Sequence, residues 1–524
     1  MKRVFNTAGA CDPRYHYIIP PEQRAPEARR LVEEMGYFAV HAPRQTGKTT
    51  LLRSLARGLT AEGRFAALRF TCETAEVAGD DFGTAERLVL GALRDSAREE
   101  LPAELRPPSW PEAEAGQRIR RGLSAWAAAC PRPLVLFFDE SDALRGDSLV
   151  SVLRQLRAGY DGRPDHFPWA VALCGLRDVR DYKVASGGDE TRLGTSSPFN
   201  VKVESLRIGD FTESEVRALY AQHTHDTGQA FTEEALGLTW HLTRGQPWLV
   251  NSLAREVVRN MAVPAAEPIT AEHIEEAKER LILARQTHLD SLAARLMEPR
   301  VRQIMAPLIA GETFADNPYD DDLRYTQDLG LIARELPLRV ANPIYSEVIV
   351  RVLAGLAEPA ILAEPRSFVL PDGRFDVQRM LREFVDFWIE HGEVIAGQMP
   401  YHEVAPQLVL MAFLQRVING GGHVHREYGV GRGRIDLLIR WPYRAEHQRA
   451  EQREAIELKV WADGQADPLA KGLAQLDGYL DRLGLTTGIL VIFDRRAAAA
   501  PIADRTHFRG GTTPSGRAVT VLRA

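Results

Sequence analysis

The stretch FAVHAPRQTGKTTLLRSLA, residues 38–56, decides the fold of the first part of this 524-residue chain. An apolar run typical of a buried strand leads into a short loop, and the loop leads into an amphipathic helix. Loops of this kind bind phosphate, because Gly47 lets the backbone come close and the amides at the helix N-terminus point toward the anion. The residues predicted to line the phosphate are Ala42, Pro43, Arg44, Gln45, Thr46, Gly47, Lys48, Thr49 and Thr50.

Two side chains at the end of this loop have specific predicted roles. Lys48 is expected to reach the β- and γ-phosphates of ATP, and the Thr49 hydroxyl is expected to ligate Mg²⁺. Ala42 stands where the motif G-x-x-x-x-G-K-S/T has its first glycine, which costs little if φ at Ala42 is negative. A chance strand, turn and helix with a lysine is the competing interpretation, and the strand and helix flanking the loop argue against it.

A second apolar run, PLVLFFDE (133–140), ends in two carboxylates. Asp139 is expected to hold Mg²⁺ through water, and Glu140 to polarise the attacking water. Taken alone, the run also fits a strand followed by a solvated acidic loop. A further strand, WAVALCG (169–175), leads to Arg177, which is either a sensor of the γ-phosphate or a surface charge.

Four segments, in order, resemble the signal-transduction ATPases with numerous domains (STAND), a branch of the AAA+ class: APRQTGKTT (42–50), LFFDESD (136–142), CGLRD (174–178) and LTRGQPWLV (242–250). The resemblance implies a helical lid with a Gly-x-Pro motif, matched by Gly245 and Pro247, whose proline contacts the nucleotide. It implies that Arg177 is the sensor and that a winged helix follows the lid. It also implies a switch between ADP and ATP states, with a nucleotide-dependent homo-oligomer.

A charged pair lies inside an apolar strand near the other end of the chain, in REAIELKVWADG (453–464). Glu457 and Lys459 alternate with aliphatic residues, so both emerge on one face of the strand. Asp436 begins the preceding apolar run, and adjacent strands would bring it to Glu457. Two neighbouring carboxylates repel unless a divalent cation lies between them, and Mg²⁺ with its waters suits a phosphodiester. Lys459 would then orient the attacking water or steady the charged transition state.

The segments GRGRID (431–436), IELK (456–459) and GLAQLDGYLDRLG (472–484) resemble the PD-(D/E)xK nuclease superfamily, in particular its RecB-like members. The resemblance implies an α-β-β-β-α-β order and a helix bearing Gln475 and Tyr479 that contacts nucleic acid or supports the site. An upstream carboxylate is expected to complete the metal site, with Glu403 as the first choice and Glu427 as the second. The competing interpretation is an exposed ion pair of little energetic value.

These features predict an α/β multidomain protein. The expected order is a P-loop ATPase core (1–200), a helical lid (201–285), a winged helix (286–360), a connector (361–399) and a restriction-endonuclease-like α/β domain (400–524). The expected recognition segment of the winged helix carries Asp320, Asp321, Asp322 and Asp328. Four acids would repel a phosphate backbone, so this module is predicted to pack and switch rather than to read DNA.

Composition limits the possible partners. Charged residues make up 26% and the net charge is -6, so any nucleic-acid contact must be local. Residues 401–524 hold 17 Arg and Lys against 13 Asp and Glu, the sign that a nucleic-acid substrate favours. Four scattered cysteines suggest neither disulfides nor zinc, and the absence of a long apolar run predicts a soluble cytoplasmic protein without a membrane partner.

The resulting hypothesis is an ATP-binding and ATP-hydrolysing switch that controls a Mg²⁺-dependent nuclease, with DNA favoured over RNA. A role in defence against phage or mobile DNA is implied only by the resemblance of this domain pairing. Two alternatives stay open: a regulatory ATPase scaffold whose nuclease-like domain binds without cutting, and a motor that moves along DNA.

Overall fold

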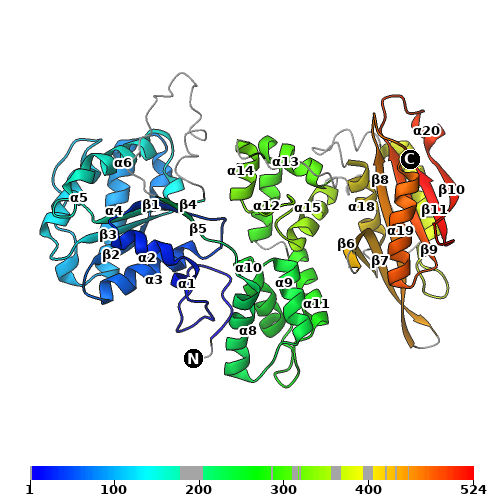
Figure 1. The fold of residues 1–524 in the computed structure, drawn as a ribbon, viewed down its shortest axis with the longest axis horizontal. Helices are drawn as coiled ribbons and strands as arrows, with labels where there is room; N and C mark the ends of the chain where they lie inside the picture. Colours follow the sequence, from blue (N-terminus) through cyan, green and yellow to red (C-terminus); the bar gives the residue numbers. More distant parts are fainter. Residues whose placement is uncertain are drawn as a thin grey trace. The chain divides into compact units, whose positions relative to one another are not determined.

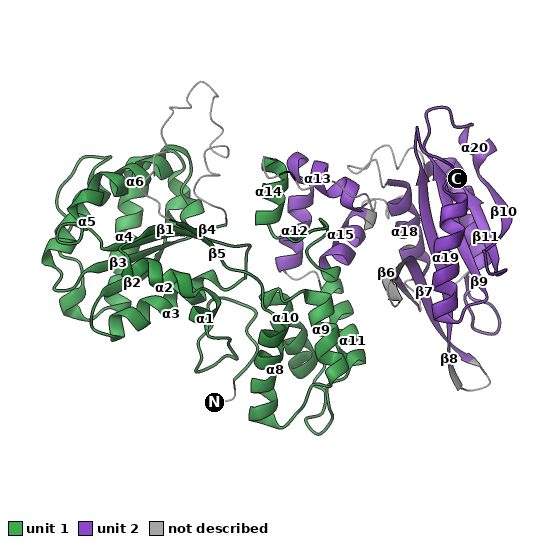
Figure 2. Ribbon diagram, in the orientation of Figure 1, with its two compact units in different colours: residues 1–286, 316–344 green, residues 287–315, 345–524 purple. Residues whose placement is uncertain are grey.

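A computed structural model describes residues 3–176, 204–284, 287–309, 317, 320–355, 368–392, 405–418, 422–430, 433–445 and 448–524. The chain forms two compact units (Figure 2). The first unit holds residues 1–286 and 316–344, and the second holds residues 287–315 and 345–524. The range predicted as a winged helix, 286–360, is therefore divided between the two units.

The first unit is built on a five-stranded parallel sheet of order β2-β3-β4-β1-β5 (Figure 1). Its strands are β1 (Tyr37–His41), β2 (Ala66–Thr71), β3 (Leu134–Asp139), β4 (Ala170–Gly175) and β5 (Glu204–Arg207). Every residue of β1, β3 and β4 is buried, because helices cover both faces of a parallel sheet. β4 lies between β1 and β3, so the strand before the phosphate-binding loop and the strand ending in Asp139 are next-nearest neighbours.

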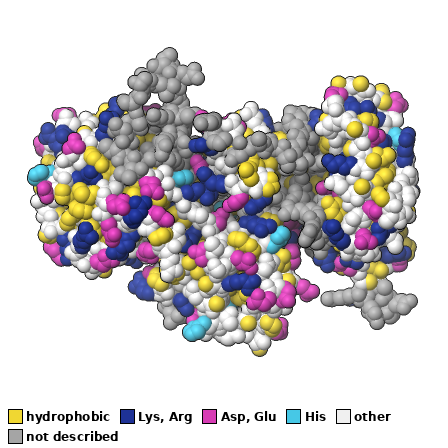
Figure 3. All heavy atoms as spheres, in the orientation of Figure 1, with side chains coloured by type: hydrophobic (Ala, Val, Ile, Leu, Met, Phe, Trp, Pro, Cys, Tyr) yellow, Lys and Arg dark blue, Asp and Glu magenta, His cyan; other side chains and the backbone are white. Residues whose placement is uncertain are grey.

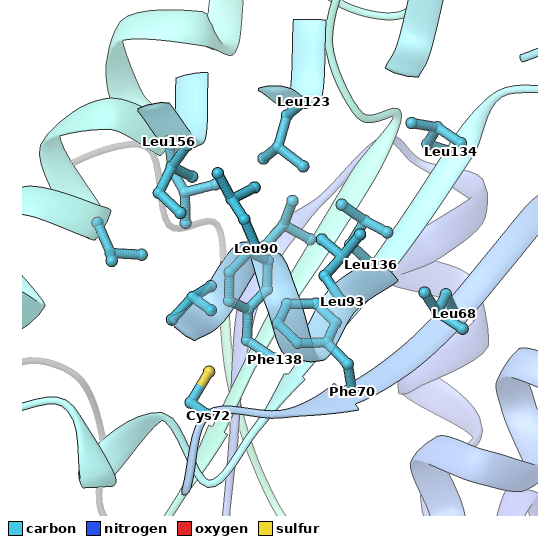
Figure 4. Packing of buried hydrophobic residues seen from close by; sticks show 14 of the residues in the cluster. Leu68, Phe70, Cys72, Leu90, Leu93, Leu123, Leu134, Leu136, Phe138 and Leu156 are labelled. Atoms are coloured by element: carbon cyan, nitrogen blue, oxygen red, sulfur yellow. The ribbon is translucent and has the colours of Figure 1, made fainter. Parts of the chain in front are cut away.

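Helices flank this sheet, and alternate strand residues divide the core into two clusters. The helices are α1 (Pro21–Arg24), α2 (Pro26–Glu33), α3 (Lys48–Ala61), α4 (Phe82–Glu100), α5 (Arg118–Ala129) and α6 (Gly146–Gly159). On one face Ala67 and Phe137 pack with Leu52 of α3. On the other face Phe70 and Phe138 pack with the leucines of α4 and α5, with the two rings 4.6 Å apart between centroids (Figure 4). Successive residues of a strand point to opposite faces of the sheet, so odd- and even-numbered positions (the parity of the residue) pack in different clusters.

Four α-helices follow the sheet within the described part of the first unit, in the range predicted as a lid. They are α8 (Glu213–Thr227), α9 (Glu233–Thr243), α10 (Pro247–Arg255) and α11 (Ala271–Leu283). Helix α8 begins with a capping box formed by Thr212 and Glu215. The N-terminal segment packs against α8, where Phe5 lies 5.4 Å from Tyr220 between ring centroids. The first unit also contains α14 (Asp321–Asp328) and a short antiparallel bridge between Ile332 and Val340.

The second unit is built on a six-stranded sheet of order β10-β11-β9-β8-β7-β6 (Figure 1). Its strands are β6 (His423–Val430), β7 (Gly433–Ala445), β8 (Gln448–Trp461), β9 (Thr487–Asp494), β10 (His507–Thr512) and β11 (Ala518–Arg523). Neighbours β6-β7-β8 and β10-β11 pair antiparallel, and β8-β9-β11 pair parallel. With α18 before β6 and α19 before β9, the element order is the α-β-β-β-α-β order expected from the sequence.

Helices cover both faces of the second unit's sheet. The α-helices of the whole second unit are α12 (Thr287–Leu296), α13 (Pro299–Ile309), α15 (Pro343–Gly355, whose first two residues are assigned to the first unit), α16 (Val377–Phe387), α18 (Ala405–Ile418), α19 (Leu469–Leu483) and α20 (Ile502–Arg505). Leu476 of α19 packs on Leu438 and Leu490. The opposite face carries Phe493, whose ring centroid lies 6.5 Å from that of Phe384 of α16. Helix α16 lies in the range predicted as a connector, and it packs on this sheet.

The surface and the helix lengths bear on possible partners. On the face seen in Figure 3, basic and acidic side chains are interspersed over the described part of each unit. Within the described ranges, no helix combines the length and apolar character needed to cross a bilayer.

Candidate functional site

The phosphate-binding loop follows β1, and α3 begins at Lys48, as predicted. Gln45 and Gly47 have φ of 59° and 98°, and Ala42 is not among the described residues with positive φ. The Lys48 ammonium donates to the carbonyls of Ala42 at 2.7 Å and Pro43 at 2.9 Å. The Lys48 ammonium is thus bonded to carbonyls of the same loop whose backbone amides are predicted to bind phosphate.

Asp139 ends β3 with its side chain 1% exposed, and Arg69 of β2 neutralises it. The Arg69 guanidinium donates to Asp139 Oδ2 from Nη2 at 2.6 Å and from Nε at 2.9 Å. The backbone N–H of Glu140 donates to the other oxygen, Oδ1, at 3.1 Å. Both oxygens of the carboxylate predicted to act on Mg²⁺ are therefore engaged by the chain itself.

Glu140 follows in a left-handed conformation, with φ of 53°. Side chains other than glycine rarely adopt this conformation, and such outliers gather at functional sites. Burial, followed by the charges of Glu73 and Asp139, raises the pKa of Glu140, while Lys48 acts in the opposite direction. A carboxylate with a raised pKa accepts a proton more readily, which suits the predicted role of Glu140 toward water.

Three further residues were predicted to contact the nucleotide: Pro247, Thr50 and Arg177. Pro247 is the buried first residue of α10, and Phe211 N donates to the carbonyl of Gly245 at 2.8 Å. The Thr50 hydroxyl accepts from Cys11 N at 3.0 Å, which ties the N-terminal segment to α3. Arg177 lies outside the described residues.

Two further neighbours of the loop were not found by sequence reasoning. The Arg24 guanidinium donates to the carbonyl of Thr46 at 3.1 Å and lies 4.6 Å over the ring of Phe211. A Cβ on Gly330 would meet the ring of Pro43 at 2.8 Å, so the turn after α14 lies against the loop. Neither contact is local in sequence, so the sequence gives no signal for it. For the pair of Arg69 with Asp139 the sequence gives one signal: an arginine inside the apolar run FAALRF (65–70) needs a polar partner.

In the second unit, the strand register brings the predicted acid pair together. β7 and β8 pair with Leu437 opposite Ile456, so Asp436 and Glu457 stand at the next position along the two strands. Asp436 Oδ2 accepts a hydrogen bond from Leu458 N at 2.7 Å. Lys459 Nζ lies 2.6 Å from Glu457 Oε1. Parity places Asp436, Glu457 and Lys459 on the sheet face that α19 covers, shared with Leu438 and Ala455.

The electrostatics of this pair fit a divalent cation. Glu457 is 2% exposed, and its Oε2 has no hydrogen-bond partner among the described residues. Burial, followed by the charge of Asp436, raises the pKa of Glu457 to about 7, although Lys459 lowers it. A buried carboxylate oxygen without a partner, beside a second carboxylate, is costly unless a proton or a metal compensates it. Asp436 and Glu457 would hold such an ion.

The rest of the predicted metal site is only partly described. On α19, Oε1 of Gln475 is also buried without a partner among the described residues. Glu403 lies outside the described residues, as does the side chain of Glu427. The backbone of Glu427 stands opposite Asp436 in the register of β6 with β7, between the pairs Arg426–Leu437 and Tyr428–Ile435. In the described part of the chain, no group of three or more His, Cys, Asp or Glu residues forms a metal cluster.

Comparisons with known proteins find no matching family model and no matching curated protein. A Walker-type ATPase of Pyrococcus abyssi is similar over 66% of this chain and 99% of its own, at 13% identity and a TM-score of 0.46. The ORC2 protein of Aeropyrum pernix covers 65% of this chain and 96% of its own, at 15% and 0.38. The RuvB Holliday junction branch migration motor of Thermotoga maritima covers 62% and 92%, at 15% and 0.33.

Likenesses at this level carry no conclusion about activity. The features of the chain itself define the class of its first unit: a five-stranded parallel α/β sheet, a glycine-lysine-threonine loop between β1 and α3, and a carboxylate at the end of β3. This arrangement fits the core of a P-loop ATPase.

Proposed function

We propose that this chain is an ATP-dependent switch that controls a Mg²⁺-dependent nuclease. The observation that carries the proposal is the pairing of Asp436 with Glu457 on neighbouring strands, with Lys459 at 2.6 Å from Glu457. A purely structural strand has no need for two adjoining carboxylates, one of them buried with an oxygen that has no partner among the described residues. That arrangement costs stability, and such costs are typical of functional sites.

In the first unit, we propose that ATP binds at the loop from Ala42 to Thr50. The Lys48 ammonium exchanges its two carbonyl partners for phosphate oxygens, and the backbone amides at the start of α3 bind the same anion. Thr49 and Asp139 are oxygen donors of the kind that Mg²⁺ prefers. Glu140 positions the attacking water, and its raised pKa suits the acceptance of a proton. Arg177 and Pro247 are the proposed sensor and lid contacts.

In the second unit, we propose that water attacks a phosphodiester bond. Asp436 and Glu457 would hold Mg²⁺, with Glu403 or Glu427 as a further ligand. Such an ion would supply positive charge for the phosphate and lower the pKa of a bound water. Lys459 orients that water or stabilises the charge that develops on phosphate. Gln475, on the helix that covers this face, supports the site. Glu457, whose pKa is raised to about 7, would have to be ionised to act as a metal ligand.

The proposed substrate is nucleic acid, with DNA favoured over RNA. Support comes from the local basic excess of residues 401–524 within a chain of net charge -6. A nucleotide-dependent homo-oligomer and a role against phage or mobile DNA rest on the STAND and PD-(D/E)xK resemblances alone.

The test is incubation of the purified full chain with plasmid, linear, single-stranded DNA and RNA, each with and without ATP and Mg²⁺. Cleavage that requires Mg²⁺ and changes with ATP supports the switch-controlled nuclease. Cleavage by Lys459→Ala equal to that of the parent would assign the second unit to binding and the chain to a scaffold. ATP hydrolysis that rises steeply with DNA length would instead favour a motor.

A further inference from the structure

Arg69 is the one charged residue in β2, and it lies on the sheet face that α3 covers. Arg69 shares parity with Ala67, and Asp139 shares parity with Phe137, so both side chains lie on the face covered by α3. Helix α3 begins with Lys48 and Thr49. The arginine therefore lies on the same face as the residues proposed to bind ATP and Mg²⁺.

Arg69 donates hydrogen bonds to the same Asp139 carboxylate that is proposed to act on Mg²⁺. Nε and Nη2 both donate to Oδ2, at 2.9 Å and 2.6 Å, and the side chains are 18% and 1% exposed. Charge-assisted hydrogen bonds of this kind are short and strong, and a buried carboxylate that loses its partner is strongly destabilised. Mg²⁺ reaches such a carboxylate directly or through one water, and it also demands near-ideal geometry. The guanidinium and the hydrated ion therefore compete for the same oxygen.

We propose that Arg69 is a built-in counter-ion for Asp139 that competes with Mg²⁺, and that it sets how strongly nucleotide binding depends on the metal. This inference rests on the proposed ATP site. With Arg69 in place, nucleotide binds almost as well without Mg²⁺ as with it, because Asp139 is already neutralised and a second cation gains little. Arg69 is thus a positioning residue that acts through Asp139, and the metal engages only when the guanidinium is displaced.

A purely structural ion pair would behave differently. It would lower stability when broken, to the same extent with and without Mg²⁺. A competing counter-ion leaves Asp139 available to the metal when it is removed, so Mg²⁺ with nucleotide restores the stability that the variant loses. The two roles therefore separate in the magnesium dependence of binding and of melting, and neither readout depends on catalytic turnover.

The experiment uses the full chain and a fluorescent ADP, with dissociation constants measured in Mg²⁺ and in EDTA. For the parent, the ratio of the two constants is expected to stay within about threefold, and for Arg69→Met it rises by roughly tenfold. Arg69→Lys, which keeps the charge but not the fork of donors, lies between them. Arg29→Met, which breaks the exposed pair with Glu62 in the same unit, matches the parent.

Melting temperature gives the second readout. Arg69→Met melts earlier than the parent in EDTA, and Mg²⁺ with ADP raises its melting temperature by more than it raises that of the parent. The double variant Arg69→Met with Asp139→Asn loses this extra rise, because the side chain at position 139 no longer carries a negative charge for Mg²⁺ to bind. An unchanged magnesium ratio in Arg69→Met, with nucleotide still bound, would overturn the counter-ion role alone. No nucleotide binding by the parent would overturn the ATP site, and this inference with it.

Discussion

The two units treat their charged groups in opposite ways. In the first unit, the chain itself supplies partners for two of the central groups: Lys48 donates to two loop carbonyls, and Asp139 is held by Arg69. In the second unit, Glu457 pairs with Lys459 through one oxygen only, and its other oxygen is buried without a partner among the described residues. Lys48 and Asp139 are thus bonded within the chain, whereas one carboxylate oxygen of Glu457 is not bonded to any described residue.

This difference bears on the two proposed ligands. At the first site, a bound nucleotide would exchange the existing hydrogen bonds of Lys48 for new ones, so its binding would compete with contacts inside the chain. At the second site, a bound cation would lower the cost of holding two carboxylates together under burial. The first arrangement fits the proposed switch, and the second fits the proposed metal site.

The largest expected effect is on the rate of nucleic-acid cleavage, and it tests the proposed metal site in the second unit. Asp436→Asn keeps an acceptor for Leu458 N but removes one charge from the metal site. We expect the cleavage rate to fall on the order of a thousandfold in a gel assay with saturating Mg²⁺. Asp481→Asn, an exposed carboxylate on α19, serves as the matched control and stays within a few-fold of the parent. Equal loss in both variants would mean that the pair at β7 and β8 has no special role.

The second effect concerns nucleotide binding at the first unit. Lys48→Ala removes the ammonium that would meet the phosphates, and affinity for ATP is expected to fall about a hundredfold by titration calorimetry. Its two partners are carbonyls of a partly exposed loop, so the change in unfolding free energy stays within about 1 kcal/mol. Arg57→Ala, on an exposed position of the same helix, leaves affinity unchanged. Undiminished ATP affinity in Lys48→Ala would remove the loop from the proposed function.

The third effect is a pH dependence of stability that originates at Glu457 in the second unit. The pKa of Glu457 is raised from 4.5 to about 7, so its stabilising contribution is complete below pH 4.5 and is lost as the pH rises through 7. Without metal, the free energy of unfolding is expected to fall over this window by about 1–3 kcal/mol. Glu457→Gln flattens the fall, and Mg²⁺ restores the parent's stability at pH 8.

Melting of the full chain in EDTA at pH 5 and pH 8, with and without Mg²⁺, measures this pH effect. The parent and Glu457→Gln are compared at each pH, so that the titration of other acids, such as Glu140 in the first unit, cancels in the difference. Superimposable pH profiles for the parent and Glu457→Gln would show that the burial of this carboxylate carries no cost.

The smallest effect compares two glycines that follow helices, one in each unit. Gly330 has φ of 78°, and a Cβ there would meet Pro43 of the phosphate-binding loop at 2.8 Å. Gly484 has φ of 65°, and a Cβ there would meet nothing within 4 Å. Gly484→Ala is expected to cost about 1 kcal/mol from backbone strain, and Gly330→Ala somewhat more, together with weaker nucleotide binding. Equal costs without a binding change would separate Gly330 from the loop's function.

Sequence reasoning succeeded where the structure depends on neighbours along the chain. The strand, loop and helix around Lys48 follow from local periodicity, and so does the placement of Glu457 and Lys459 on one face of their strand. Helix α16 falls in the range 361–399 assigned to a connector, and its packing on the sheet was not predicted. That packing depends on Phe384 meeting Phe493, 109 positions later in the sequence. The pairing of Arg69 with Asp139 was missed for the same reason, since only the β2–β3 register brings the two strands together.

The amino-acid order alone determined which chemical groups this protein possesses and which faces of its strands and helices they occupy, since backbone geometry imposes a period of two or 3.6 residues wherever an element forms. Tertiary structure decided which of these groups meet: Asp436 beside Glu457, Arg69 on Asp139, Gly330 against Pro43. Those encounters depend on register and packing between distant segments, where a shift of one residue would turn each side chain to the opposite face.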